Sequence, residues 1–203
     1  LMLMRTDQLS PAQTRQLEMI FGAGKQLLAL VEDVLDLSKV ESGDVRVEQC
    51  EVDVCATLRA CAALIEGQRA RLGVALVDRL PTTPLMALAD PQRLQQVFTN
   101  LLTNAYEALE GRGTVTITAS LAAPAGMPRA LPAVHVEVTD TGPGMPQEVA
   151  DKVFDPFFTT KAQGSGLGLA IVRKIVDAHD GRLSLLTNPG TGTTITVTIP
   201  AQH

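Results

Sequence analysis

Apolar positions near the start of the chain recur at helical spacing. Ser10 followed by Pro11 is a typical helix start, because serine caps the first N–H groups and proline fits the first helical position. Beyond them, apolar or small residues recur at alternating intervals of three and four, at Leu17, Ile20, Gly24, Leu27, Val31, Val34 and Ser38. This seam is widened on one side by Phe21, Leu28 and Leu35.

The length and width of the seam predict one long helix over residues 10–43, which packs in a helical bundle and ends with Gly43 as a left-handed cap. An ordinary amphipathic helix that packs on its own domain is the alternative, and the length of the pattern favours the bundle. Residues 1–6 resemble the end of a preceding antiparallel helix. We therefore interpret residues 1–43 as a helical segment distinct from the remainder of the chain.

After Gly43 the period of the pattern changes, and strand-like and helix-like segments alternate. Strand patterns cover 44–52, 74–80, 114–121, 134–140, 182–186 and 193–200. Helical patterns cover 54–72, 91–110 and 167–179, whereas the stretch 146–164 is irregular. This order predicts an α+β fold over residues 44–203, with one mixed sheet that carries helices on one face.

Composition and charge narrow the possible partners. The 203 residues carry a net charge of −5, and only 3% of them are aromatic. The sequence has no basic patch and no aromatic stacking surface, so we exclude nucleic acid as a partner. Cys50, Cys55 and Cys61 lack metal-ligand spacing and are odd in number, which favours reduced thiols and a cytoplasmic location.

No membrane-spanning segment is expected within this sequence. No apolar run reaches the roughly 18 residues that a spanning helix needs, and no signal peptide is recognisable. The chain starts at Leu1 rather than at Met, so we expect a fragment, with any membrane anchor in the part upstream.

The first of three segments with candidate chemistry is GSGLGLAIVRKIV, from Gly164. Gly164, Gly166 and Gly168 lead directly into a helix, whose N–H groups and positive dipole favour an anion such as phosphate. The run is not a Walker A loop, because no Gly-Lys-Ser/Thr follows, and no strand leads straight into it as in a dinucleotide fold. From this run alone, a plain glycine-rich turn fits as well as a phosphate site.

Of the other two segments, one follows the end of a predicted strand and the other lies on a predicted helix. Asp140, in DTGPGM, can accept a hydrogen bond from an exocyclic amine such as that of adenine, and an Asp-Thr-Gly turn fits it equally well. Asn100 and Asn104 lie four residues apart, so they share one face of a helix. Their amide oxygens can ligate Mg²⁺, although two such amides taken alone are more often solvated surface residues.

Together and in this order, the segments resemble the boxes of the nucleotide-binding fold shared by histidine kinases, gyrase-type topoisomerases, a heat-shock chaperone ATPase and mismatch-repair ATPases. The N box is similar to residues 96–108, the G1 box to DTGPG, the F box to FDPFFTTK (154–161), the G2 box to GSGLGLA and a G3-like segment to GTGTTITV (190–197). The histidine kinase branch fits best, and residues 10–43 resemble the second helix of its dimerisation domain. The resemblance implies a two-layer α/β sandwich, the Bergerat or GHKL fold.

The resemblance also implies residue roles toward ATP and Mg²⁺. Asn104 would be the Mg²⁺ ligand with Asn100 assisting, and these two are the implied catalytic residues. Asp140 would bind the adenine amine, helped by a water and by Thr194. The adenine pocket would be shaped by Gly142 and Gly144, and the phosphates would be covered by the backbone of Gly164, Gly166, Leu167 and Gly168.

Residues 146–163 would form a mobile lid over the nucleotide. Phe154, Phe157 and Phe158 would be its hinge and apolar latch, with plain core packing as the alternative. Lys161 is a candidate contact to the terminal phosphate, and a solvated lysine fits the position equally well. Glu107 departs from the many relatives that carry a basic residue at this position, so the basic group on the phosphate side stays open.

The implied reaction is transfer of the γ-phosphoryl group of ATP to a histidine, for relay to the receiver domain of a response regulator. In the ATPases of this fold, a glutamate four residues before the metal-binding asparagine activates water. Asn100 occupies that position here and cannot act as a base near neutral pH, so we expect slow hydrolysis. A hydrolysing GHKL ATPase and a non-catalytic nucleotide-binding dimerisation scaffold are the alternatives.

The phospho-accepting histidine of the family is absent from this sequence. His135, His179 and His203 do not match its motif, so we expect the acceptor on a helix before Leu1. The chain should therefore bind ATP without phosphorylating itself, and should form a homodimer through helix 10–43.

Overall fold

The computed structural model describes residues 10, 12–22, 24, 27, 31, 48–69, 73–109, 111–122, 132–161 and 164–201. The chain divides into two compact units, Leu1–Gly43 and Asp44–His203. The features expected at residues 1–6, Val34, Ser38 and Gly43 lie outside the described residues.

The first unit contains a helix over residues 12–22, and Gly24, Leu27 and Val31 are also helical. The predicted start at Ser10 is confirmed, because the Ser10 Oγ accepts the Gln13 N–H at 3.3 Å. The Gln13 Oε1 accepts the Ser10 N–H at 2.9 Å, which completes a reciprocal capping box that we did not predict. The large apolar side chains exposed on this helix are Met19, Ile20, Phe21, Leu27 and Val31.

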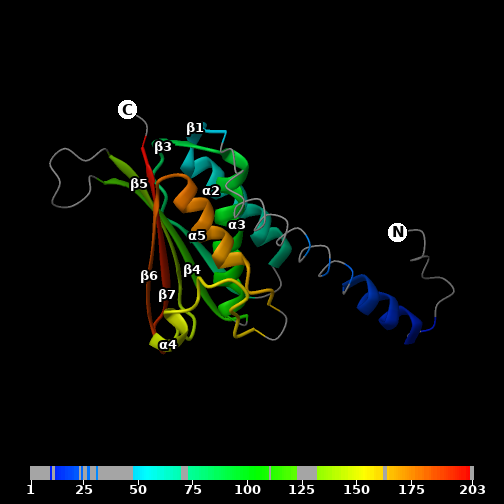
Figure 1. Ribbon diagram of the computed structural model, residues 1–203. Helices are drawn as coiled ribbons and strands as arrows, with labels where there is room; N and C mark the ends of the chain where they lie inside the picture. Colours follow the sequence, from blue (N-terminus) through cyan, green and yellow to red (C-terminus); the bar gives the residue numbers. More distant parts are fainter. Residues whose placement is uncertain are drawn as a thin grey trace. The chain divides into compact units, whose positions relative to one another are not determined.

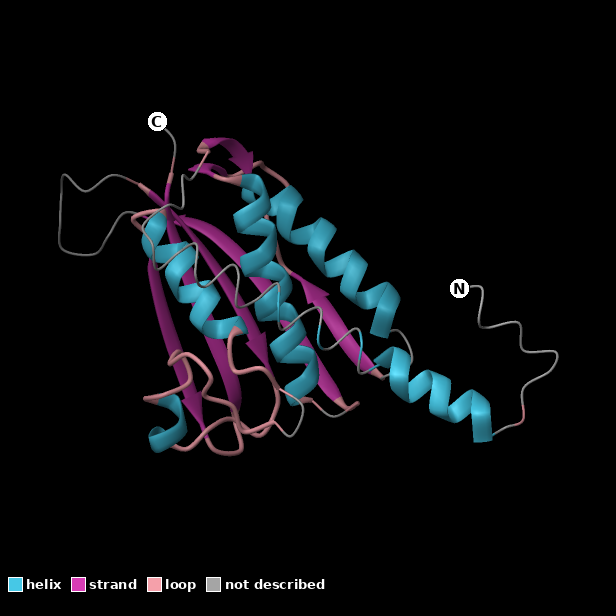
Figure 2. Cartoon of the chain, turned by 45° about the vertical axis from the view of Figure 1, so that its right-hand side comes forward, coloured by secondary structure: helices cyan, strands magenta, loops and turns pink. Residues whose placement is uncertain are grey.

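In its described residues, the second unit is built from a five-stranded sheet, a two-stranded sheet and four helices. The helices are α2 (Val54–Arg69), α3 (Pro91–Ala108), α4 (Gln147–Ala150) and α5 (Gly168–Ala178). The strands are β1 (Cys50–Asp53), β2 (Val74–Asp78), β3 (Met86–Ala89), β4 (Gly113–Ala122), β5 (Ala133–Asp140), β6 (Arg182–Asn188) and β7 (Gly192–Pro200). Figures 1 and 2 show α2, α3 and α5 lying across one face of the larger sheet.

The five-stranded sheet is mixed, as predicted. Its strand order is β2-β4-β5-β7-β6, in which β2 and β4 run parallel and the other neighbours run antiparallel. In β7 the side chains alternate: the face packed against the helices is apolar, with Ile195, Val197 and Ile199 buried. The opposite face carries threonines, at Thr194, Thr196 and Thr198. Because one face of the sheet is solvated, this period of two is strong in the sequence.

Helix α3 lies at the centre of the helical layer. Its buried stripe consists of Leu94, Val97, Phe98, Leu101, Leu102, Ala105 and Tyr106. Asp90 caps its N-terminus, because the carboxylate Oδ1 accepts the Gln92 and Arg93 N–H groups at 3.0 and 3.1 Å. The Asp90 N–H in turn donates to the buried His179 Nε2 at 3.0 Å, and His179 Nδ1 contacts the Ile175 carbonyl at 2.7 Å. One imidazole therefore joins the end of α5 to the start of α3.

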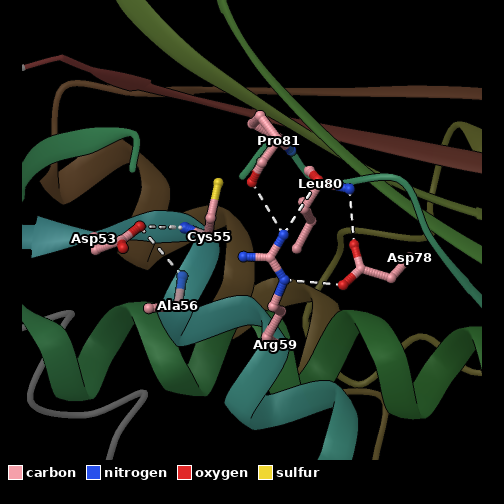
Figure 3. Close-up of polar contacts among 7 residues, drawn as sticks. All are labelled: Asp53, Cys55, Ala56, Arg59, Asp78, Leu80 and Pro81. Carbon is pink, nitrogen blue, oxygen red and sulfur yellow. Dashed lines mark hydrogen bonds and ion pairs between the residues drawn. The ribbon is translucent and has the colours of Figure 1, made fainter. Parts of the chain in front are cut away.

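An arginine joins α2 to the loop that follows β2, as Figure 3 shows. The Arg59 Nε donates to the Asp78 carboxylate at 2.9 Å, and Nη2 donates to the carbonyls of Leu80 and Pro81 at 3.1 and 3.0 Å. Burial by itself raises the pKa of Asp78, but the Leu80 N–H and the Arg59 guanidinium outweigh it and lower the pKa. The start of the loop after β2, at Leu80 and Pro81, is thereby held against α2.

Three segments differ from the sequence-based prediction. The strand expected over 44–52 is β1, Cys50–Asp53: Glu48 and Gln49 are not strand, and residues 44–47 lie outside the described part. Strand β3 was not predicted, and the region 146–164 contains the short helix α4. None of the helices searched among the described residues is both long enough and apolar enough to cross a membrane.

Candidate functional site

The two asparagines of α3 lie against the first residue of α5. The Asn100 Nδ2 donates to the Gly168 carbonyl at 3.3 Å. A Cβ placed on Gly168 would be 3.8 Å from the Asn100 Oδ1 and 3.9 Å from the Asn104 Nδ2. The structure thus brings the amides of α3 together with the glycine run that starts α5, although the two segments are far apart in sequence.

The amide oxygen of Asn104 contacts a cationic side chain. The Lys161 Nζ donates to the Asn104 Oδ1 at 2.7 Å and to the Glu107 Oε2 at 2.7 Å. An amide oxygen that accepts from an ammonium group faces a position suited to a positive charge, which also fits a metal ion. No cluster of three or more His, Cys, Asp or Glu side chains with metal-binding geometry occurs among the described residues.

Asp140 is a buried carboxylate at the end of β5, with only 6% of its surface exposed. Its Oδ1 accepts the Gly142 N–H at 2.8 Å. Burial raises the pKa of Asp140, and the hydrogen bonds from the Gly142 and Thr193 backbones oppose this effect only in part. A carboxylate kept inside an apolar layer at a cost in solvation is a frequent sign of a binding role.

Gly142 connects Asp140 to the C-terminal end of α3. A Cβ on Gly142 would lie 2.8 Å from the Asp140 Oδ1 and 3.2 Å from the Ala108 carbonyl, so a larger residue here would crowd the Asp140 carboxylate between the strand end and the helix. Ala108 is one helical turn beyond Asn104. Asp140 and Asn104 therefore border the same end of α3.

The turn after Asp140 is fixed to the hairpin between β6 and β7. Gly144 has a φ of +65°, and a Cβ there would overlap the Asn188 carbonyl. The Met145 N–H donates to the Thr187 Oγ1 at 2.9 Å, and the Gly190 N–H donates to the Pro143 carbonyl at 2.6 Å. These contacts hold the DTGPGM turn in one conformation beside Asp140.

The expected position of Thr194 beside Asp140 is wrong. Thr194 is paired with Thr139, and their hydroxyls lie 3.0 Å apart on the face of the sheet opposite to Asp140. Thr193 is the residue paired with Asp140, and it is 8% exposed. Because side chains alternate along a strand, an error of one residue exchanges the two faces. Only the register between β5 and β7 could have identified Thr193.

The glycine run before α5 is a tight turn with internal hydrogen bonds. The Gly164 N–H donates to the Lys161 carbonyl at 3.2 Å, and the N–H of the buried Leu167 donates to the Ser165 Oγ at 3.3 Å. Gly166 has a φ of +69°, and a Cβ there would lie 2.5 Å from the Phe157 carbonyl carbon. The turn therefore packs directly on the F-box segment. The first N–H groups of α5 have no acceptor within their own helix and suit an anion.

The phenylalanines of that segment have different surroundings. The Arg173 guanidinium lies over the Phe154 ring, 5.9 Å from its centroid. Phe157 has a φ of +65° and is 63% exposed, and Phe158 is half-buried. Phe157 thus has a strained backbone and little apolar cover in this arrangement.

Comparisons with known proteins place this chain in a family. The family model described as "Histidine kinase-, DNA gyrase B-, and HSP90-like ATPase" matches residues 89–203. The sensor histidine kinase ZraS of Escherichia coli strain K12 is 43% identical over 112 residues, which are 55% of this chain and 22% of that kinase. The chain spans 22%, 22% and 36% of the length of the first three curated relatives.

Solved structures give the same result. The structure of full-length ShkA in complex with AMPPNP has a TM-score of 0.80 and 28% identity, over 98% of this chain and 41% of that one. The structure of the histidine kinase ThkA in complex with the response regulator TrrA has a TM-score of 0.74 and 29% identity, over 99% of this chain and 55% of that one.

Proposed function

This chain belongs to the family of histidine kinase-, DNA gyrase B- and HSP90-like ATPases, in its sensor histidine kinase branch, and from that premise we propose that it binds Mg-ATP and transfers the terminal phosphoryl group to a protein histidine. The observation that carries the proposal is the meeting of three segments around α3. Asn104, Asp140 and the glycine turn at Gly166–Gly168 are distant in sequence, yet all border this helix or the start of α5.

Each segment supports one part of the binding. The buried Asp140 carboxylate accepts the adenine amine, and Gly142 and Gly144 keep the surrounding turn close to it. Asn104 offers its amide oxygen to Mg²⁺, which neutralises phosphate charge when bound. The first N–H groups of α5 and the glycine turn hold the phosphates, and Lys161 is placed to contact the terminal one.

Phosphoryl transfer requires positioning and charge neutralisation more than covalent chemistry by the protein. A hydrolysing ATPase needs a base beside the phosphates. Asn100 is not a base near neutral pH, and its amide nitrogen already bonds the Gly168 carbonyl. This arrangement favours a histidine acceptor over water.

We place the acceptor histidine on a preceding helix, outside these 203 residues. His179 is buried between α3 and α5, and His135 is half-buried in β5. Neither matches the motif of the acceptor, and His203, which does not match it either, lies outside the described residues. The chain is therefore expected to phosphorylate an acceptor supplied from outside.

We also propose two protein partners and a location. The exposed apolar side chains of the first helix suit a homodimer through residues 10–43. ThkA was solved with a response regulator, and we infer a receiver domain as the partner that takes the phosphoryl group onward. The odd number of cysteines and their spacing favour reduced thiols, from which we infer a cytoplasmic location.

The test supplies the acceptor in trans. The chain is mixed with a separate dimerisation hairpin that carries the histidine, and with ATP labelled in the γ-phosphate. We expect acid-labile label on the hairpin with wild-type chain and its loss with N104A. Rapid release of labelled inorganic phosphate, with no label on the hairpin, would support the ATPase alternative. Binding of ATP with Mg²⁺, with neither label on the hairpin nor release of phosphate, would support the scaffold alternative, and no affinity for ATP would contradict the proposal.

A further inference from the structure

The side chains of Asn104, Glu107 and Lys161 form a polar cluster, which we name the lysine clamp. Asn104 and Glu107 lie three residues apart, so they share one face of α3. Lys161 comes from the segment between α4 and α5. Its Nζ donates to the Asn104 Oδ1 and the Glu107 Oε2, at 2.7 Å in each case.

The lysine clamp and a metal ion compete for the same oxygen. The ammonium group is a donor only and carries a full positive charge. If the Asn104 oxygen accepts from Lys161, a divalent cation cannot bind it closely, because the two positive charges would repel each other at short range. Lys161 must therefore leave Asn104 before a metal–nucleotide complex can use that oxygen.

We propose that the lysine clamp weakens the retention of the diphosphate product, and that Glu107 is the positioning residue that holds Lys161 on α3. The proposal rests on the proposed function, since it takes Asn104 as the ligand of the metal in the nucleotide complex. With a triphosphate bound, the terminal phosphate offers Lys161 a new anionic partner in place of Glu107. With a diphosphate, that partner is missing, and the lysine returns to Asn104 and Glu107.

The expected effect is moderate because the pair is partly solvated. The Lys161 and Glu107 side chains are 39% and 37% exposed. An ion pair with this exposure changes an equilibrium by no more than about five-fold. We therefore expect changes of about three-fold in the affinity for a diphosphate, which calorimetry resolves.

The experiment is a double-mutant cycle on the binding of ADP with Mg²⁺. The dissociation constant is measured for the wild type, E107Q, K161M and the double variant E107Q/K161M. Each single variant should bind ADP about three-fold more tightly, and the double variant should bind no more tightly than K161M. The affinity of K161M for ATP with Mg²⁺ should not rise, because this variant also loses the contact to the terminal phosphate.

Glu137 and Arg79 offer matched controls. Both are exposed, Glu137 in β5 and Arg79 directly after β2, so E137Q and R79M remove one negative and one positive charge outside the segments that we assign to the nucleotide. They should leave the affinity for ADP unchanged, and circular dichroism should show that every variant is folded.

Two results would overturn this inference but leave the proposed function unaffected. If E107Q tightens ADP binding equally in the wild-type and K161M backgrounds, Glu107 acts by direct repulsion of the phosphates. If K161M weakens ADP binding, the lysine helps to hold the product. A wild-type chain that binds neither ATP nor ADP in the presence of Mg²⁺ would instead overturn the proposed function, and this inference with it.

Discussion

At the scale of single residues, Asp140 is the side chain on which nucleotide recognition depends most directly. Asparagine at this position keeps the size and an oxygen for the Gly142 N–H, but it loses the charge that makes the carboxylate a strong acceptor. We expect D140N to weaken ATP binding by about 10- to 100-fold, or roughly 1.4–2.8 kcal/mol, while the fold persists. Calorimetry with ATP measures this loss. An unchanged affinity would mean that Asp140 does not contact the base.

The same substitution should weaken nucleotide binding but stabilise the nucleotide-free chain. Because burial raises the folded-state pKa of Asp140 above its unfolded value, the folded state binds more protons between the two values. The carboxylate therefore costs stability as the pH rises through this window. D140N should raise the melting temperature at pH 7, and the gain should shrink as the pH falls from the raised folded-state pKa toward the ordinary carboxyl pKa. A melting temperature that is lower at pH 7 would contradict this reasoning.

At the scale of elements, His179 joins two helices whose relative position sets the site. Its ring accepts the Asp90 N–H and contacts the Ile175 carbonyl, so its loss leaves both groups unsatisfied and opens a cavity. We expect H179A to lower the free energy of unfolding by about 2–4 kcal/mol. H135A makes the same change in a half-buried strand position and should cost less than about 1 kcal/mol. Urea titration compares them, and equal losses would exclude a special role for His179.

The elements that sequence could predict are those with strong local periodicity. The alternation in β5 and β7 and the apolar stripe of α3 are properties of contiguous residues, and these elements were located within a few positions. Strand β3 is only four residues long and rich in alanine, and it is a strand because β1 pairs with it. A pairing between distant segments has no signature in either one.

In the candidate site, too, features set by local spacing could be predicted, whereas contacts between distant segments could not. The glycine turn and the shared face of Asn100 and Asn104 could be predicted because their spacing reports a local turn and one helix face. Thr193 was missed because its choice over Thr194 depends on strand register. The contact of Lys161 with Glu107 joins positions 54 apart, and nothing in either segment predicts it.

At the scale of the whole molecule, the second unit contains its own core. The buried apolar residues of the described chain begin at Val52 and continue to Ala201, so none belongs to the first unit. Every contact that we assign to the nucleotide site also lies within Asp44–His203. A unit that contains the described core and every contact that we assign to the site should fold and bind independently of the helix before it.

Removal of residues 1–43 tests this independence. We expect the shortened chain to keep its melting temperature and to bind ATP with Mg²⁺ within about two-fold of the full chain, because no core or site residue is lost. Its sedimentation should change from dimer to monomer, since the apolar side chains exposed on the helix, from Met19 to Val31, are removed with it. If affinity for ATP falls together with dimerisation, the first unit contributes to the nucleotide site, and catalysis would then depend on assembly as well as on the acceptor.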